Sequence, residues 1–228
     1  MSRKKVVNYV KTRSEDSFQR RHGATNVFIK DPLSNDINLE SVFTKIQALL
    51  PTHILNLADD VYVGDFDFLK DRAINASFLD GAIYISNEQD NESDLLDDVV
   101  HEFAHAIEEK YGWFVYEDGN LHFEFLRKRA ALERVLKSHG FETSEYIFKN
   151  IEFDENFDDF LYREVGYEKL NKFINGLFVN SYAPTSLREY FASGFEEFYL
   201  GDRGYLRKLC PYIYEKVYTL HEGETDEI

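Results

Sequence analysis

Apolar residues recur at helical spacing along several stretches of the chain. In residues 41–50, 93–111 and 121–139 they lie three or four positions apart, which is typical of helices that bury one face. The second stretch is followed by Gly112, a residue type that commonly ends helices, so we expect that helix to end there. Similar spacing predicts further helices in residues 153–179, where it is less regular, and in residues 186–200 and 204–220.

A different pattern, short and rich in β-branched and aromatic residues, marks the region between the first two helices. Residues 76–86, ASFLDGAIYIS, predict a β-hairpin whose turn is Asp80-Gly81. Residues 53–66 predict a pair of strands, whereas residues 22–40 are rich in turn formers and predict irregular surface structure. Few strands followed by many helices indicate an α+β fold, with a small mixed sheet and a mostly helical C-terminal part.

The composition narrows the kind of protein. We expect an N-terminal arm over residues 1–40 and one domain over residues 41–228, because 228 residues suffice for a single sizeable core. The one cysteine, Cys210, cannot form an intrachain disulfide, which fits a reducing compartment. No apolar run is long enough to span a bilayer, and the N-terminus lacks the apolar core of a signal peptide. These features predict a cytoplasmic protein that does not bind membranes.

The formal net charge of -16 argues against nucleic-acid binding, because phosphate contacts need clustered lysine and arginine. The first 21 residues are the exception, since they carry several basic side chains. They are interpreted either as a solvated arm or as a docking arm for an acidic protein partner.

The chemistry-bearing motif is HEFAH, residues 101–105, on the second predicted helix. His101 and His105 are four positions apart, so their rings lie one turn apart on one helix face and can converge on a metal ion. Glu102 lies one position along, where it can reach a water on that ion as a general base without binding the metal itself. The alternative interpretation is a solvated helix face that happens to carry two histidines.

Two imidazoles are an incomplete metal site, so a third ligand must come from elsewhere. Catalytic zinc sites use three protein ligands and water, whereas structural sites rely on cysteine, so one distant cysteine favours the catalytic kind. The sequence lacks the glycine and third histidine that would extend the motif in histidine-rich zincins. The residues themselves leave several third ligands open, among them His122, His139, His221, Glu124 and Glu133.

A second window, SYAPTSLREYFASGFEEFYLGD, resembles the catalytic domain of anthrax lethal factor and the related secreted Pro-Pro endopeptidases. In that family a tyrosine is followed seven residues later by the glutamate of Glu-aromatic-Phe-Ala, as Tyr182 is followed here by Glu189 in Glu189–Ala192. The segment LRKLCPYIYEKV is similar to the Cys-Pro-containing final helix of the endopeptidases. The resemblance covers about residues 80–220, and its specificity lies in two short windows.

The resemblance implies a zincin-like fold, with Zn²⁺ bound by His101, His105 and Glu189 and with Tyr182 stabilising the transition state. One position departs from the family, which usually carries a second acid one turn after the glutamate ligand, where Ser193 stands here. The role of that acid is then either absent or supplied by another residue, such as Glu196. The stretch from residue 80 to residue 109 is also similar to metallopeptidase-like proteins of tailed bacteriophages, which extends the expected location to the virion.

Two functions follow. The first is a zinc-dependent endopeptidase that hydrolyses a protein or peptide substrate by a zinc-activated water, with Glu102 as general base. Its substrate would lie extended along an edge strand, for which GAIYIS, residues 81–86, is the candidate. The alternative is a catalytically weak or inactive zincin-fold protein with a structural or binding role, such as a virion component, which Ser193 and the basic arm favour.

Overall fold

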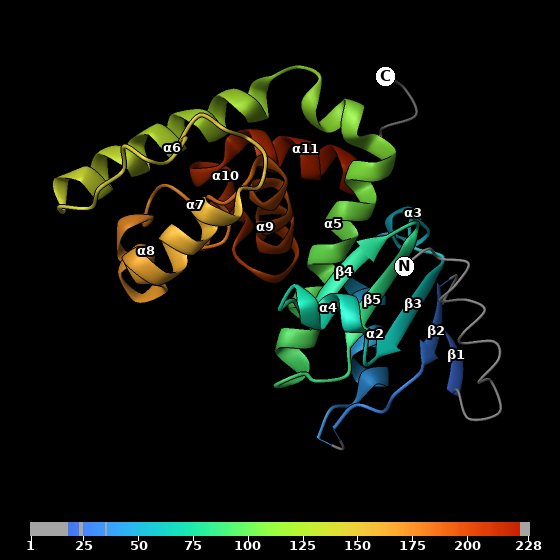
Figure 1. The fold of residues 1–228 in the computed structure, drawn as a ribbon. Coiled ribbons are helices and arrows are strands. Elements are labelled where there is room, and N and C mark those ends of the chain that lie inside the picture. The colour runs from blue at the N-terminus through green and yellow to red at the C-terminus, as the bar shows by residue number, and fades with distance from the viewer. Residues whose placement is uncertain (1–17, 23–24, 35, 224–228) are drawn as a thin grey trace. The chain divides into compact units, whose positions relative to one another are not determined.

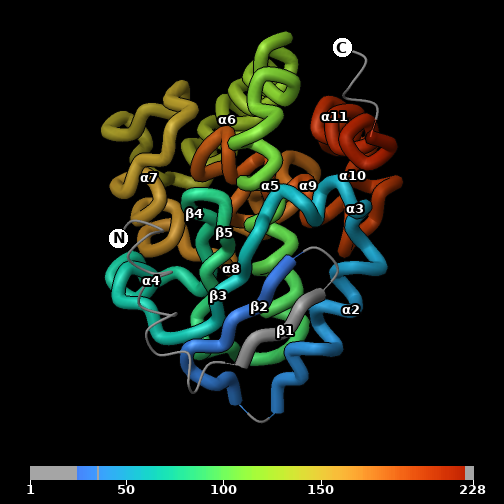
Figure 2. Tube along the Cα trace, turned by 90° about the vertical axis from the view of Figure 1, so that its right-hand side faces the viewer, coloured from blue at the N-terminus to red at the C-terminus, as the bar shows by residue number. Residues whose placement is uncertain are grey.

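The computed structural model describes residues 18–22, 25–34 and 36–223 (Figures 1 and 2). The chain divides into two compact units, Met1–Lys110 and Tyr111–Ile228. All described strands belong to the first unit and the second unit is helical, which confirms the predicted α+β class. The boundary expected at residue 40, between an arm and a single domain, does not coincide with this division after Lys110, and it stays a prediction. Most of the basic arm expected at residues 1–21 lies outside the described residues, so its docking role also stays a prediction.

The first unit contains a mixed sheet of five strands in the order β1-β2-β3-β5-β4. The central pairs are parallel and the two outer pairs are antiparallel, so β1 and β4 form the edges. The strands are β1 (Phe18–His22), β2 (Thr25–Ile29), β3 (Asp60–Gly64), β4 (Ala76–Leu79) and β5 (Ala82–Ser86).

Two expectations for this unit are wrong. The segment predicted to be irregular contains β2, which forms because it pairs in parallel with β3, a strand far along the chain. The region predicted as two paired strands contains the short helix α3 (Thr52–Leu55) and then β3 alone. β2 also pairs antiparallel with β1, and β3 pairs in parallel with β2 and β5. Parallel partners are distant in sequence and leave no local turn signal.

The β4–β5 hairpin is confirmed, and its geometry decides which backbone groups face outward. Asp80 and Gly81 have φ values of 51° and 77°, which is a two-residue turn of type I′. In such a hairpin the flanking pair, Leu79 and Ala82, is hydrogen-bonded and ladder bonds recur at every second pair. The N–H and C=O of Phe78 therefore point away from β5, at the open edge of the sheet.

Each face of the sheet is covered by helices of the same unit (Figures 1 and 2). On one face an aromatic row runs from Phe28 through Tyr62 to Tyr84, with ring centroids 5.2 and 5.3 Å apart, and α4 (Asp67–Asp71) packs beside it. The other face carries α2 (Leu39–Leu49) and the first part of α5. The α2 helix confirms the helix predicted at residues 41–50.

The helix α5 (Glu92–Tyr116) carries the HEFAH motif and runs past the end predicted for it. Gly112 does not end the helix. Instead Tyr111 has non-helical angles, φ -118° and ψ 20°, and produces a kink at the boundary between the two units. The apolar residues after Gly112 continue to be buried in part, so tertiary packing extends the helix beyond the glycine.

The second unit is an assembly of helices around an aromatic core. The helix predicted at residues 121–139 is confirmed as α6, and the helix predicted at residues 204–220 is divided where Pro211 starts a new helix. The elements are α6 (Asn120–Ser138), α7 (Glu155–Asp159), the π-helix η1 (Phe160–Gly166), α8 (Tyr167–Phe173), α9 (Leu187–Leu200), α10 (Arg203–Leu209) and α11 (Pro211–Glu222).

Within the part of the chain that the structure describes, no helix has both the length and the apolar content needed to cross a membrane.

Candidate metal centre

The two motif histidines lie on α5 as the helical spacing predicts. His101 and His105 are partly exposed, and their ring centroids are 5.1 Å apart with an angle of 74° between the ring planes. The opposite side of the helix is anchored by apolar side chains with at most 1% of their surface exposed: Leu95, Val99, Val100, Phe103 and Ile107. Burial of that side fixes the rotation of the helix about its axis, so the histidines are presented together.

Glu189 lies in the first turn of α9, where local hydrogen bonds hold the backbone. The Ser186 side chain caps the helix by accepting the N–H of Glu189, with an N···O distance of 3.1 Å. The preceding loop is shaped by Asn180, whose Oδ1 accepts the N–H groups of Tyr182 and Ala183 at 3.1 and 2.8 Å. The backbone of Glu189 is thus held in place by the N-terminal cap of α9.

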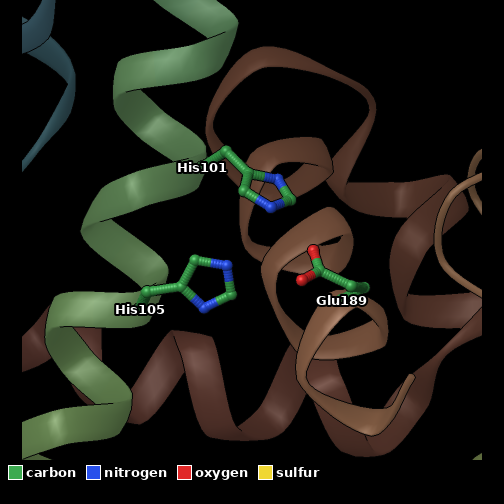
Figure 3. A group of neighbouring side chains, drawn as sticks. All are labelled: His101, His105 and Glu189. Carbon is green, nitrogen blue, oxygen red and sulfur yellow. The ribbon is translucent and has the colours of Figure 1, made fainter. Parts of the chain in front are cut away.

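One potential ligand atom from each of His101, His105 and Glu189 lies within 4.8 Å of the others (Figure 3). In a tetrahedral zinc site the ligand atoms lie roughly 3.4 Å apart. Two imidazoles and one carboxylate could therefore hold a divalent metal. Among the described residues, this is the group of three histidine, cysteine, aspartate or glutamate side chains whose donor atoms lie close enough together to hold a metal ion.

The other side chains that the sequence leaves open as a third metal ligand contact residues outside the HEFAH motif. Glu124 accepts the hydroxyl of Tyr190, and Glu133 pairs with Lys137. His139 Nδ1 lies 2.8 Å from the carbonyl of Val135, and His221 Nδ1 lies 3.0 Å from the hydroxyl of Tyr199. Neither these residues nor His122 belong to the group of donors that contains the motif histidines.

A carboxylate that sequence analysis missed contacts one of the histidines. The Nδ1 atom of His105 lies 2.6 Å from Oε2 of Glu108, one turn further along α5. Both side chains are largely buried, with 12% of the His105 side chain and 5% of the Glu108 side chain exposed. The spacing of three residues on a helix is a signal that could have identified this pair.

The central glutamate of the motif has a partner on the sheet. Glu102 is 7% exposed, and its Oε2 accepts the backbone N–H of Phe78 on β4 at 2.5 Å. This is the outward-pointing N–H at the open edge of the sheet. No sequence signal identifies a contact between a helix side chain and the backbone of a distant strand.

Further carboxylates surround the motif. Burial raises the pKa of Asp98 to about 6, and the neighbouring charge of Glu102 adds to the effect. Within the described structure, Oδ2 of Asp98 is buried and has no hydrogen-bond partner. In the second unit, burial raises the pKa of Asp158, and the charges of Asp159 and Glu189 contribute in the same direction. Negative charge is thus concentrated near both sets of donors, which favours a cation.

A buried polar network in the second unit holds α9 against α6. The hydroxyl of Tyr190 donates to Oε1 of Glu124 at 2.7 Å, and both side chains are at most 1% exposed. Beside them, Lys128 donates to the carbonyls of Leu177 and Leu209 at 2.5 and 2.7 Å. Because Tyr190 is the next residue after Glu189, this network fixes the helix turn that carries the carboxylate.

Tyr182 and Ser193 both lie in the described part of the chain. The backbone carbonyl of Tyr182 accepts two hydrogen bonds from Thr185, one from its N–H at 3.0 Å and one from its side-chain hydroxyl at 2.8 Å. Tyr182 itself is partly exposed. Ser193 is 1% exposed, and its Oγ has no hydrogen-bond partner in the described part of the chain. The position where the family pattern expects a second acid on α9 is therefore buried.

Comparison with known proteins finds no relative. No protein-family model matches the chain, and neither the curated proteins nor the solved structures contain a significant match. What is established for this molecule is thus an α+β fold with a group of two histidines and one glutamate that could bind a metal ion.

Proposed function

We propose that this protein is a zinc-dependent endopeptidase of the class with a glutamate as third ligand, in which His101, His105 and Glu189 hold the metal ion. The observation that carries the proposal is the proximity of these three donors, although Glu189 comes 84 residues after His105 in the chain. The likeness of the HEFAH and SYAPTSLREYFA windows to the lethal factor family supports the same set and implies a zincin-like fold.

The donor set fits a catalytic zinc ion better than a structural one. Structural zinc sites close with four protein ligands, whereas two histidines and one carboxylate leave a position open for water or substrate. The Lewis acidity of zinc bound there would make a water nucleophilic near neutral pH.

Glu102 is the proposed general base. It is one residue from His101, and it does not belong to the group of potential ligands. Its carboxylate would accept the proton of the attacking water and later deliver it to the leaving amine. The N–H of Phe78, at 2.5 Å from Oε2, orients this carboxylate.

Tyr182 is the proposed donor to the developing oxyanion. Its place seven residues before Glu189, in a loop shaped by Asn180, agrees with the family pattern. A hydroxyl donor at such a position typically contributes about 3 kcal/mol to stabilising the transition state.

The proposed substrate is an extended segment of a protein or peptide. The edge of the sheet beside the motif is β4, not the GAIYIS strand named from the sequence, because β5 is paired on both sides. The backbone groups of β4 that point away from β5 belong to Ala76 and Phe78; the Phe78 N–H is bonded to Glu102, so the Ala76 N–H and the carbonyls of both residues are the groups that could pair with a substrate strand. Their proximity to Glu102 would place the substrate backbone beside the proposed base.

The test compares wild type with Glu102→Ala for bound zinc and for hydrolysis of a mixed peptide library, with cleavage products followed by mass spectrometry. The proposal predicts one zinc per chain in both proteins and cleavage only by wild type. Cleavage by Glu102→Ala at the rate of wild type would contradict the role of Glu102.

The second candidate is a zincin-like protein that binds zinc but cleaves nothing, for example a virion component. The buried Ser193, in place of the acid expected from the family, favours it. This candidate predicts stoichiometric zinc and no cleavage of any library member by wild type, so the same experiment separates the two functions.

A further inference from the structure

The contact between His105 and Glu108 lies entirely within the first unit of the chain. The Nδ1–Oε2 distance of 2.6 Å is short for a nitrogen–oxygen hydrogen bond. The two residues are three positions apart on α5, so the helix backbone itself keeps them adjacent. With 5% of its side chain exposed, Glu108 is removed from competing water, and the hydrogen bond is stronger than one at the surface.

This hydrogen bond determines which ring nitrogen of His105 is available to a metal ion. A carboxylate oxygen can only accept, so Nδ1 is the nitrogen that carries the hydrogen. The lone pair then resides on Nε2, which is the form of imidazole that binds a metal ion. A carboxylate partner also makes the ring a stronger ligand and holds its orientation.

We infer that Glu108 is the positioning residue of the proposed metal centre: it fixes the tautomer and orientation of His105 so that Nε2 faces the ion. The inference rests on the proposed metal site.

A purely structural role for Glu108 is the competing explanation. Such a role would alter the stability of the fold without altering the protonation pattern of the ring. The tautomer of His105 therefore separates the two explanations.

The matched variants are Glu108→Ala, Glu108→Gln, Glu108→Asp and Glu109→Ala. Glu109 is the next acid on the same helix and is exposed, so its substitution removes the same charge and leaves the contact between His105 Nδ1 and Glu108 in place. Glutamine keeps an acceptor for Nδ1–H but not the charge, and aspartate keeps the charge on a shorter side chain. Thermal unfolding of each metal-free variant checks that the fold is intact.

The first measurement is ring nitrogen NMR of ¹⁵N-histidine-labelled, metal-free protein at neutral pH, with His105→Gln used to assign the signal. Wild type, Glu108→Gln and Glu109→Ala are expected to show hydrogen on Nδ1 and a free Nε2. Glu108→Ala is expected to show a mixture dominated by the other tautomer. An unchanged tautomer in Glu108→Ala would overturn the inference.

The second measurement is the zinc dissociation constant by competition with a chromophoric chelator. Glu108→Ala is expected to weaken zinc binding about 10- to 100-fold, as loss of a carboxylate partner of a histidine ligand typically does. Glu108→Asp is expected to recover part of the affinity, and Glu109→Ala to keep all of it. Equal affinity of wild type and Glu108→Ala would overturn the inference. Failure of wild type to bind zinc would instead contradict the proposed metal site, a result that is distinct from either outcome for Glu108.

Discussion

The backbone N–H of Phe78, on the edge strand β4, donates a hydrogen bond to the carboxylate of Glu102, on the helix α5, with an N···O distance of 2.5 Å. The type I′ turn at Asp80-Gly81 makes this contact possible, because it leaves the Phe78 N–H pointing out of the sheet. The proposed general base is thus oriented by the same strand that would bind the substrate backbone.

Phe78→Pro tests this orientation, since proline has no N–H to donate. The N–H takes no part in pairing with β5, so the sheet ladder should survive at an edge strand. We expect zinc binding to be retained and the turnover rate to fall about 10-fold or more, because a general base contributes roughly 100- to 10,000-fold when well placed. Steady-state kinetics with a cleaved peptide, together with zinc analysis, check this outcome.

Phe78→Ala is the control, because it removes the ring and keeps the N–H. It should leave the turnover rate much closer to that of wild type. Equal turnover by wild type and Phe78→Pro would show that the hydrogen bond does not orient the base.

Tyr190→Phe should destabilise the second unit. The substitution leaves the buried carboxylate of Glu124 without its hydroxyl donor, at a cost of about 1–3 kcal/mol. Urea unfolding followed by circular dichroism measures the change in the free energy of unfolding. In a double-mutant cycle with Glu124→Gln, the second substitution should cost less when Tyr190 is already phenylalanine, and strictly additive losses would contradict the coupling.

Asp98 predicts a pH dependence of stability in the metal-free protein. Burial raises its pKa from 3.8 to about 6, so folding favours the protonated carboxyl. The contribution of this group to stability is therefore fully present below pH 3.8 and is lost as the pH rises through about 6. At pH 7–8 the ionised group costs up to about 3 kcal/mol.

Asp98→Asn removes this titration and should make the protein more stable than wild type at pH 8. The advantage should shrink as the pH falls toward 4, as measured by urea unfolding of chelator-treated protein at a series of pH values. A stability difference that stays constant from pH 4 to pH 8 would contradict the raised pKa of Asp98.

The predictable parts of the molecule are those governed by local pattern. The helix carrying His101 and His105, the Asp80-Gly81 hairpin and the α9 helix all follow from spacing and turn chemistry that act over a few residues. The pairing of Glu189 with the two histidines required the resemblance to a family, because no local rule connects residues so far apart.

The parts that sequence analysis missed depend on tertiary pairing. β2 and the identity of β4 as the edge strand follow from the order of a sheet whose central partners are parallel and distant. The end of α5 is a further example, because the helix kinks at Tyr111 and continues past Gly112, where the sequence predicts that it ends. Tertiary packing, and not the glycine, determines where this helix ends. Glu108 differs from these, because its place three residues after His105 is a helical spacing that the sequence itself contains.

The most direct test of the proposed metal centre is zinc analysis of purified wild type, Glu189→Ala and Glu196→Ala after dialysis against zinc and then against buffer. Glu196 is the acid two turns further along α9; with the positioning role assigned to Glu108 and not to Glu196, its substitution controls for general loss of negative charge from that helix. The account predicts one zinc per chain in wild type and in Glu196→Ala, and little or none in Glu189→Ala. Absence of zinc from wild type, or equal zinc in wild type and Glu189→Ala, would contradict it.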